Sequence, residues 1–525
     1  MVSTFMGLET ARRGMTAQQS ALYTLGHNIS NANTPGYTRQ RVNFTQTTSF
    51  PSVGMNAPQI PGQMGTGVQA GAVQRIRDSF LDTQYRGESN KVGYYGTLSD
   101  SLSKMEGIMN EPSDSGLQST MEKFWNSLQT LSSNPENSGA RDVVAANGQM
   151  VADTINYYYN SLSSIQTDIG NQIDVKTSSV NSIIDNIDQL NHQIASVEPN
   201  GYLPNDLYDQ RDALVDQLSS MINIKVSSVK PANYGNAKPI AEGLYNIELI
   251  NKEGKPYSPA IELIPVTSED GMKAVNKLTV NYEKSSDPKG AVTGVTIGAQ
   301  TVTDMNFSGE LAGAIESYGY TSSTGEAKGT YPDMLNQLNK MTEAFANEFN
   351  KIHSEGYALG ASTKSGMNFF SFTAGDAAKS ITVSKTILDN PVNIAAGKNS
   401  GASGDNGNAQ VLADLKKVNF SDYAFYKDPA NKLPDGLTGS FDSFYAGLIG
   451  KLGVNSQSAQ KNSSNSQVLA DSVDKNRQSV SSVSLDEEMT DMIKFQQAYN
   501  ASARNITIVD EMLDKIINGM GTGGR

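Results

Sequence analysis

Few side chains in this sequence of 525 residues could carry out acid–base or nucleophilic chemistry. The chain contains no cysteine and three histidines, His27, His192 and His353. A nucleophilic serine or threonine needs a base beside it, and none of these histidines lies in a recognisable catalytic motif. All three stand in segments of helical patterning and ordinary polar composition. We therefore expect no catalytic residue and no enzyme activity.

Three short segments have residue types that metal or cofactor sites use. The acidic residues 486–488 are consecutive, so on a helix they point in different directions and do not converge on one ion. They suit the first turn of a helix instead, where the helix dipole stabilises anions. Residues 405–408 lack the twelve-residue spacing of a calcium loop and predict a turn. Residues 65–70 match a dinucleotide fingerprint, but an alternating run follows them where a helix should open, so we predict a strand. We expect no metal and no cofactor.

The two ends of the chain each carry an apolar row that repeats every seven residues, which is the spacing of a coiled-coil seam. Two amphipathic helices that pack on separate domains would show similar rows. The pattern also leaves open whether a pair would be parallel or antiparallel. We predict that the ends pair as a coiled coil and form an assembly interface, whose candidate residues are Leu8, Met15, Leu22, Ile29, Met492, Phe495, Tyr499, Ile506, Val509 and Leu513.

An asparagine-rich turn follows the first of these rows. Pro35 cannot continue a helix, and Gly36 suits the positive φ of a type II turn. Residues 37–44 then alternate as an edge strand does. The candidate residues of this turn motif are Asn28, Asn31, Asn33, Pro35, Gly36 and Tyr37.

The turn motif resembles the N-terminal signature of flagellar rod, hook and hook-associated proteins. Residues 484–489 and 495–504 resemble the matching C-terminal signature, and the two stand in the right order at opposite ends. Within this superfamily the chain is most similar to hook-filament junction proteins of the FlgK type. The segments that carry the finer resemblance are residues 37–40, 110–117, 203–212 and 403–409.

The resemblance implies a structural adaptor between hook and filament. It implies self-assembly into a short helical layer or ring, with hook protein below, a second hook-associated protein and filament above, and an export chaperone. It also implies export through the flagellar type III apparatus to an extracellular position. The stretch after Phe370 is short for a family that often carries a large inserted domain there. The alternatives are a hook or distal-rod axial protein, and, from another class, a secreted coiled-coil adhesin or binding module.

Composition narrows the function further. The chain has 41 Lys and Arg against 54 Asp and Glu, a net charge of -13, which argues against nucleic acid as a partner. No apolar run approaches the ~20 residues that span a bilayer, so we expect no membrane insertion. Glu9, Arg12 and Arg13 interrupt the start of the chain, so no cleavable signal peptide is predicted.

The fold class that these patterns predict is mainly α with a β-rich insertion, built from long helices in an elongated rod. Residues 140–198 read as one long helix, with a frame shift between Ile169 and Ile173 that predicts local unwinding. Trp125 marks the core of another helix, Tyr331–Pro332 begins a third, and Leu469, Val473, Val480 and Val483 mark a last one. The predicted domains are 1–35 with 484–525, a terminal coiled coil; 36–85, an extended segment with short strands; 86–225 with 308–483, a long-helix bundle; and 226–307, a β-rich insertion.

Overall fold

The computed structural model describes residues 4–51, 54–55, 62–285, 289–322 and 324–519. Contacts divide the chain into two compact units. The first unit comprises Met1–Asn90, Val180–Lys277 and Gln467–Arg525, and the second comprises Lys91–Ser179 and Leu278–Ser466. Three long helices contribute residues to both units, namely α2 (Ser79–Met109), α4 (Ser138–Val197) and α11 (Phe441–Ser481).

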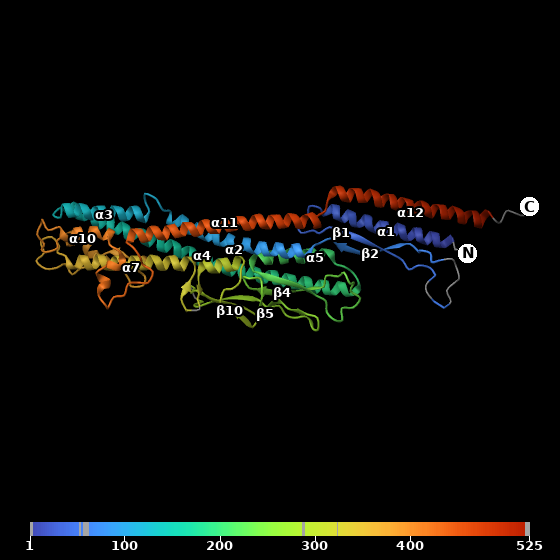
Figure 1. The fold of residues 1–525 in the computed structure, drawn as a ribbon, viewed down its shortest axis with the longest axis horizontal. Helices are drawn as coiled ribbons and strands as arrows, with labels where there is room; N and C mark the ends of the chain where they lie inside the picture. Colours follow the sequence, from blue (N-terminus) through green and yellow to red (C-terminus); the bar gives the residue numbers. More distant parts are fainter. Residues whose placement is uncertain (1–3, 52–53, 56–61, 286–288, 323, 520–525) are drawn as a thin grey trace, which may run out of the picture. The chain divides into compact units, whose positions relative to one another are not determined.

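The first unit combines the two terminal helices with short antiparallel sheets (Figure 1). Strands β1 and β2 pair as an antiparallel ribbon, β3, β4 and β5 form a second sheet, and β6 pairs with β7. The elements in chain order are α1 (Thr4–Ser30), β1 (Gln40–Gln46), β2 (Val68–Arg75), α5 (Asn205–Met221), β3 (Ile224–Val229), β4 (Leu244–Ile250), β5 (Pro256–Ile264), β6 (Val266–Thr267), β7 (Gly271–Met272) and α12 (Leu485–Gly519).

The second unit packs helices around an aromatic core and carries a five-stranded sheet in the order β10-β9-β11-β12, with β8 also paired to β9. Its longer elements are α3 (Leu117–Ser133), β8 (Leu278–Tyr282), β9 (Val292–Ile297), β10 (Gln300–Val302), α6 (Glu310–Tyr318), α7 (Thr330–Glu355) and α10 (Gly407–Asp414). The shorter ones are β11 (Tyr320–Thr321), β12 (Ala327–Lys328), β13 (Phe370–Ser371), α8 (Ala377–Ser380), β14 (Thr382–Val383) and α9 (Lys385–Leu388).

Trp125 lies in the core of the second unit, as predicted. It is 3% exposed, and its ring centroid lies 5.7 Å from that of Phe345 on α7. Phe369 packs over the helical Gly148, where an added Cβ would lie 2.8 Å from the ring. The glycine therefore lets the ring approach the helix backbone. The other rings of this cluster are Phe124, Phe349 and Phe370.

Several predicted elements are confirmed. Helix α4 runs without a break over 60 residues, and α7 begins with Pro332 in its first turn. Strand β4 covers residues 244–250, and β9 covers residues 292–297 of the predicted β-rich region. Strand β2 begins directly after Gly67, where the sequence predicted a strand instead of a nucleotide-binding helix.

The predicted unwinding of the long helix is wrong. The backbone stays α-helical through the frame shift, and both Ile169 and Ile173 are buried. Because α4 contributes to two units, its buried face can change along its length without a break in the helix.

The prediction for the last helix of the bundle was also partly wrong. Helix α11 begins at Phe441, well before the predicted row, and ends before Val483. Leu469 and Val480 of that row are exposed. After Leu452 the helix buries small residues instead, which do not appear as an apolar row; the buried positions there include Ser456, Ala459, Ser466 and Ala470. Within the described part of the chain, no helix is long and apolar enough to cross a membrane.

Candidate assembly site

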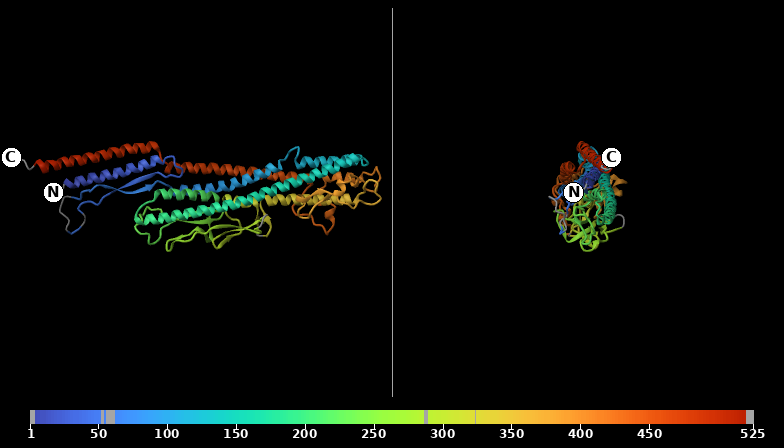
Figure 2. Two further views of the ribbon diagram at one scale, coloured as in Figure 1. Left: turned by 180° about the vertical axis from the view of Figure 1, so that it is seen from behind. Right: turned by 90° about the vertical axis from the view of Figure 1, so that its right-hand side faces the viewer.

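The two terminal helices, α1 and α12, lie side by side and run in opposite directions (Figures 1 and 2). A Cβ added at Gly7 would lie 3.8 Å from Val509, and one added at Gly14 would lie 4.0 Å from the Cβ of Ser502. Between these two pairs α1 advances by seven residues while α12 goes back by seven. The structure therefore places Gly7 and Gly14 of α1 against Val509 and Ser502 of α12 in an antiparallel arrangement.

On α12 the predicted interface residues share one face. That face is half-buried, while Ile493, Ile508 and Ile517 on other faces are largely exposed. The half-buried residues are Met492, Phe495, Tyr499, Ile506, Val509 and Leu513.

On α1 the four predicted residues Leu8, Met15, Leu22 and Ile29 are also half-buried, but they are not its most buried positions. Helix α1 contacts α12 on one side and the β1–β2 ribbon on another. Phe44 of the ribbon in turn packs edge-on against Phe495 of α12, with ring centroids 5.9 Å apart. Three of the four buried apolar residues of α1 are alanines, whose small side chains let its neighbours approach closely; the four are Ala11, Ala17, Ala21 and Leu25.

The turn motif closes α1 as the sequence predicted. Gly36 has φ +79, and the Tyr37 backbone N–H donates to the Thr34 carbonyl at 3.2 Å, which is the geometry of a type II turn. The Asn31 side chain donates to the carbonyl of His27 at 3.1 Å, and Asn33 and Pro35 are exposed. Burial, followed by the nearby carboxylates of Asp206 and Asp209, raises the pKa of Tyr37.

Asn28 is the member of the motif that joins the two ends of the chain. It is fully buried, and its side-chain amide donates to the Gln40 carbonyl at 2.8 Å and to Glu488 Oε2 at 2.9 Å. Its oxygen accepts from Tyr37 Oη at 2.8 Å and from the Gln40 backbone N–H at 3.0 Å. All four hydrogen-bonding positions of the amide are therefore used.

Glu488 is fully buried in the first turn of α12, and its other carboxylate oxygen accepts from Arg39 Nε at 2.6 Å. Arg39 also pairs with the exposed Glu487 at 2.9 Å, and its backbone N–H donates to the Ser481 carbonyl at 2.8 Å. We call Asn28, Arg39 and Glu488 the polar clasp. Residues 486–488 lie in the first turn of α12, as the sequence predicted, but the partners of Glu488 were not predicted. The available signal was that a polar residue stands at one end of a row spaced by seven in each helix, at Asn28 after Gly7, Gly14 and Ala21, and at Glu488 before Phe495, Ser502 and Val509.

A second buried charge cluster lies in α5, within the sequence segment 203–212. Asp212 is fully buried, and three guanidinium groups reach it: Arg75 at 2.9 Å, Arg77 at 3.0 Å and Arg86 at 3.1 Å. Tyr245 Oη donates to the same carboxylate at 2.9 Å. Burial alone would raise the pKa of Asp212, but these cations hold it well below its usual value. The cluster ties the end of β2 and the start of α2 to α5 and β4.

The histidines have ordinary structural environments. His353 on α7 is fully buried; its Nε2 accepts from the Ala395 backbone N–H at 3.0 Å, and its Nδ1 lies 2.8 Å from the Met367 carbonyl. Nδ1 therefore carries the proton. His27 lies 3.3 Å from Asp206 at the surface, and His192 is exposed on α4. Among the described residues, no group of histidine, aspartate and glutamate is arranged to hold a metal ion. The Asp405 carboxylate accepts backbone N–H groups of its own loop, as a turn requires.

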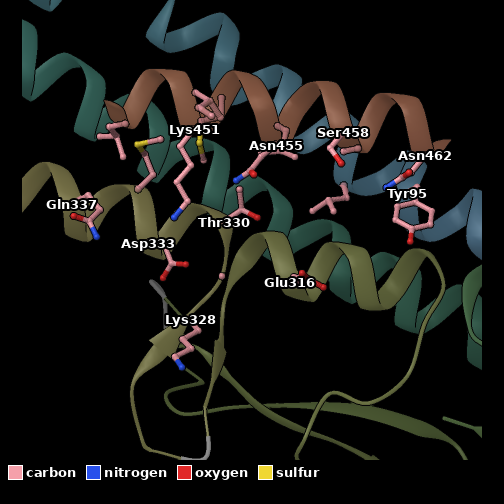
Figure 3. A pocket seen from close by; sticks show the side chains of 18 of the residues that line it. Tyr95, Glu316, Lys328, Thr330, Asp333, Gln337, Lys451, Asn455, Ser458 and Asn462 are labelled. Carbon is pink, nitrogen blue, oxygen red and sulfur yellow. The ribbon is translucent and has the colours of Figure 1, made fainter. Parts of the chain in front are cut away.

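A hollow of about 620 Å³ in the second unit is lined by polar and apolar side chains from α2, α6, α7 and α11 (Figure 3). Lys451 and Asn455 reach into it from α11, and Asp333 faces them from α7. Burial raises the pKa of Asp333. The residues that line this hollow include no histidine.

Comparisons with known proteins place the two ends of the chain in one class. Residues 8–38 match the family model "Flagella basal body rod protein", and residues 476–519 match "Flagellar basal body rod FlgEFG protein C-terminal". These are the segments that form α1 with its turn, and the end of α11 with α12. The class is that of flagellar proteins with rod-type ends.

The middle of the chain gives the particular family. Residues 102–370, more than half of the chain, match "Flagellar hook-associated protein FlgK helical domain". Flagellar hook-associated protein 1 of Bacillus subtilis (strain 168) is 46% identical over 534 aligned residues, covering 100% of both chains. The protein of the same name from Salmonella typhimurium is 26% identical and covers 97% of this chain and 98% of its own. The chain therefore belongs to the FlgK family of flagellar hook-associated proteins.

A solved structure agrees with this fold. The flagellar hook junction protein FlgK from Burkholderia pseudomallei matches with a TM-score of 0.55 at 15% identity, over 76% of this chain and 100% of that one. The alignment with the Salmonella relative runs over 595 positions, more than the 525 residues of this chain. That relative therefore carries segments that this chain lacks.

Proposed function

We propose that this chain is the structural adaptor that joins the flagellar hook to the filament. The observation that carries this proposal is the full-length similarity to flagellar hook-associated protein 1, which extends from the first heptad row to the last. The antiparallel contact of α1 with α12 supports this proposal. In a tubular assembly the same contacts recur in every subunit, and paired terminal helices give each subunit the same surface for them.

We further propose that α1 and α12 form a coiled coil whose half-buried rows are the assembly interface. Terminal helices of a shared type can continue an inner tube, while the parts of the chain between them form an outer layer. In this proposal the domains are the terminal pair (1–35 and 484–525), the connecting ribbon (36–85), the helix bundle (86–225 and 308–483) and the β-rich insertion (226–307). The chain assembles into a short helical layer or ring, between hook protein on one side and a second hook-associated protein with filament on the other.

The chain acts in this proposal as a building block and not as an enzyme. It leaves the cell through the flagellar type III apparatus without cleavage of a signal peptide, with the help of an export chaperone, and takes its place outside the cell. Two other functions compete with this one. A hook or distal-rod protein would be needed to build the hook itself, and a secreted coiled-coil adhesin would be dispensable for filament attachment.

Deletion of the gene distinguishes these functions. We expect intact hooks, no attached filament, and flagellin released into the medium, because the hook lattice then lacks the layer onto which filament assembles. Electron microscopy of the cells and immunoblotting of the medium measure both outcomes, and restoring the gene serves as the control. Loss of the hook would favour the axial alternative, and full-length filaments on the deletion strain would favour the adhesin.

A further inference from the structure

We propose that the polar clasp sets the register of the α1–α12 pair, so that the two ends of the chain meet in one heptad alignment only. This inference deepens the proposed coiled-coil pairing and rests on it. It assigns to Asn28, Arg39 and Glu488 a positioning role in assembly.

The apolar rows alone leave the register ambiguous. On α1, the residues Gly7, Gly14 and Ala21 follow one another at intervals of seven, and Asn28 is next in the row. The row opposite, in reverse order, is Val509, Ser502, Phe495 and Glu488. The contacts of Gly7 with Val509, of Gly14 with Ser502 and of Asn28 with Glu488 all belong to one alignment. Because both rows repeat every seven residues, a slip by one heptad again brings small and apolar residues together along most of the pair.

A slip by one heptad separates the buried polar partners of the clasp, whereas elsewhere in the two rows it exchanges small and apolar residues. In one direction Glu488 would lie against Ala21, and in the other Asn28 would lie against Phe495. Either slip takes the buried carboxylate away from Asn28 and leaves one N–H group of the Asn28 amide without its acceptor. A buried charge that loses its hydrogen bonds is strongly destabilising. A single buried asparagine fixes the register of coiled coils for the same reason.

Arg39 links this register to the rest of the first unit. Its side chain is 15% exposed and pairs with Glu488, while its backbone N–H holds the Ser481 carbonyl at the end of α11. Gln40, the next residue, begins β1 and exchanges two hydrogen bonds with Asn28. The clasp therefore fixes where α12 starts relative to the ribbon as well as relative to α1.

Disulfide trapping tests the proposal cleanly, because the chain has no cysteine of its own. Gly14→Cys with Ser502→Cys reports the observed register, since the 4.0 Å between the Cβ positions suits a disulfide. Gly7→Cys with Ser502→Cys, and Gly14→Cys with Val509→Cys, report the two slipped registers. In the observed register each slipped pair is separated by about 10 Å along the helices, which is too far for a disulfide. Each pair is oxidised in the full chain, both isolated and assembled in flagella, and the cross-linked fraction is read on non-reducing gels.

With the clasp intact, we expect the in-register pair to exceed each slipped pair by at least about tenfold. In the variant Asn28→Leu with Glu488→Leu, the ratio should fall to within roughly threefold, because apolar residues accept either alignment. Glu488→Gln, which keeps the shape but loses the charge, should give an intermediate ratio and serves if the double variant does not fold. Glu487→Gln is the matched control, because this exposed neighbour also pairs with Arg39 and should leave the ratio unchanged.

Circular dichroism verifies that the helices persist in each variant. An unchanged ratio in both clasp variants would overturn the proposal, as would slipped pairs that cross-link as readily as the in-register pair with the clasp intact. Failure of the in-register pair to cross-link in either state would refute the pairing of α1 with α12 itself. That outcome is separate from the deletion experiment, which judges the junction function.

Discussion

Asp212 illustrates at the scale of a single residue how this chain uses buried charge. Its carboxylate meets three guanidinium groups and a tyrosine hydroxyl, so every lone pair direction has a partner. Removal of one member leaves the others buried and incompletely paired, which costs more than the pair itself contributes. The polar clasp follows the same logic with fewer members, since it too buries one carboxylate among donors from distant segments.

Asp212→Asn should therefore lower the free energy of unfolding by roughly 3–5 kcal/mol. The folded-state pKa of Asp212 lies below its unfolded value, so this stabilisation is present above about pH 4 and is lost only as the pH falls through the folded pKa. Urea unfolding followed by circular dichroism at pH 7 measures the loss. Asp206→Asn on the same helix, where the side chain is 63% exposed, should change stability by less than about 0.5 kcal/mol. Equal stability of the two variants would contradict the assignment.

His353 makes the second unit sensitive to acid. Burial lowers its pKa from 6.5 to about 4, so the folded state keeps the imidazole neutral where the unfolded chain binds a proton. Stability should be greatest above pH 6.5 and fall as the pH drops toward 4, by an amount on the order of 2–3 kcal/mol. Thermal unfolding between pH 7.5 and 4.5 measures this slope. His353→Gln should flatten it while His192→Gln, at an exposed position, should not; a slope that survives His353→Gln would exclude this origin.

At the scale of the element, α12 has one face that packs and others that do not. Ile506 and Leu513 lie on the half-buried face, whereas Ile508 is 48% exposed. The helix therefore has one face that α1 covers, and its apolar residues on other faces stay exposed.

Ile506→Asp or Leu513→Asp should separate the terminal helices, because each places a charge in the seam at a cost of about 1–3 kcal/mol for a half-buried site. Secretion should persist while incorporation into flagella fails. Hydrogen exchange of α1 and immunoblots of secreted and flagellar fractions measure the two effects. Ile508→Asp is the matched control and should leave α1 protected as in the parent. Normal incorporation of both seam variants would show that these residues do not form the interface.

At the scale of the whole molecule, the chain has two compact units, and its first and last helices belong to the same one. The second unit has its own aromatic core around Trp125 and does not depend on the terminal pair for burial. We therefore expect folding of the middle of the chain to be separable from the proposed assembly through its ends.

Removal of residues 1–30 and 485–525 should leave the second unit folded but abolish incorporation into flagella. The aromatic core keeps its partners, so near-ultraviolet circular dichroism and tryptophan fluorescence should match those of the full chain. Co-sedimentation with hooks and filaments measures incorporation, with the full chain as control. A truncated chain that still attaches would point to a binding module of the adhesin type.

The sequence by itself determined the features that depend on neighbouring residues. Heptad spacing marked the face of α12 that packs, proline and glycine marked the end of α1 and its type II turn, and alternation located β4 and β9. These features are local, because helix period and turn chemistry act within a few residues. The heptad spacing also predicted that the two terminal helices pair, but it left open whether they run parallel or antiparallel.

Only the tertiary structure decided which residues meet across the chain. The antiparallel alignment, the burial of Glu488 beside Asn28 and the three arginines around Asp212 join positions that lie more than a hundred residues apart. A polar residue gives the same sequence signal at the surface as in a core, because its partner and not its type decides whether burial is favourable. Buried small residues are also hard to recognise in a sequence, because they do not form an apolar row. Ala459 and Ser466 of α11 are buried in the structure but add little hydrophobicity to the pattern. The sequence thus specified elements and faces, whereas the partners of each buried polar group emerged only from the folded chain.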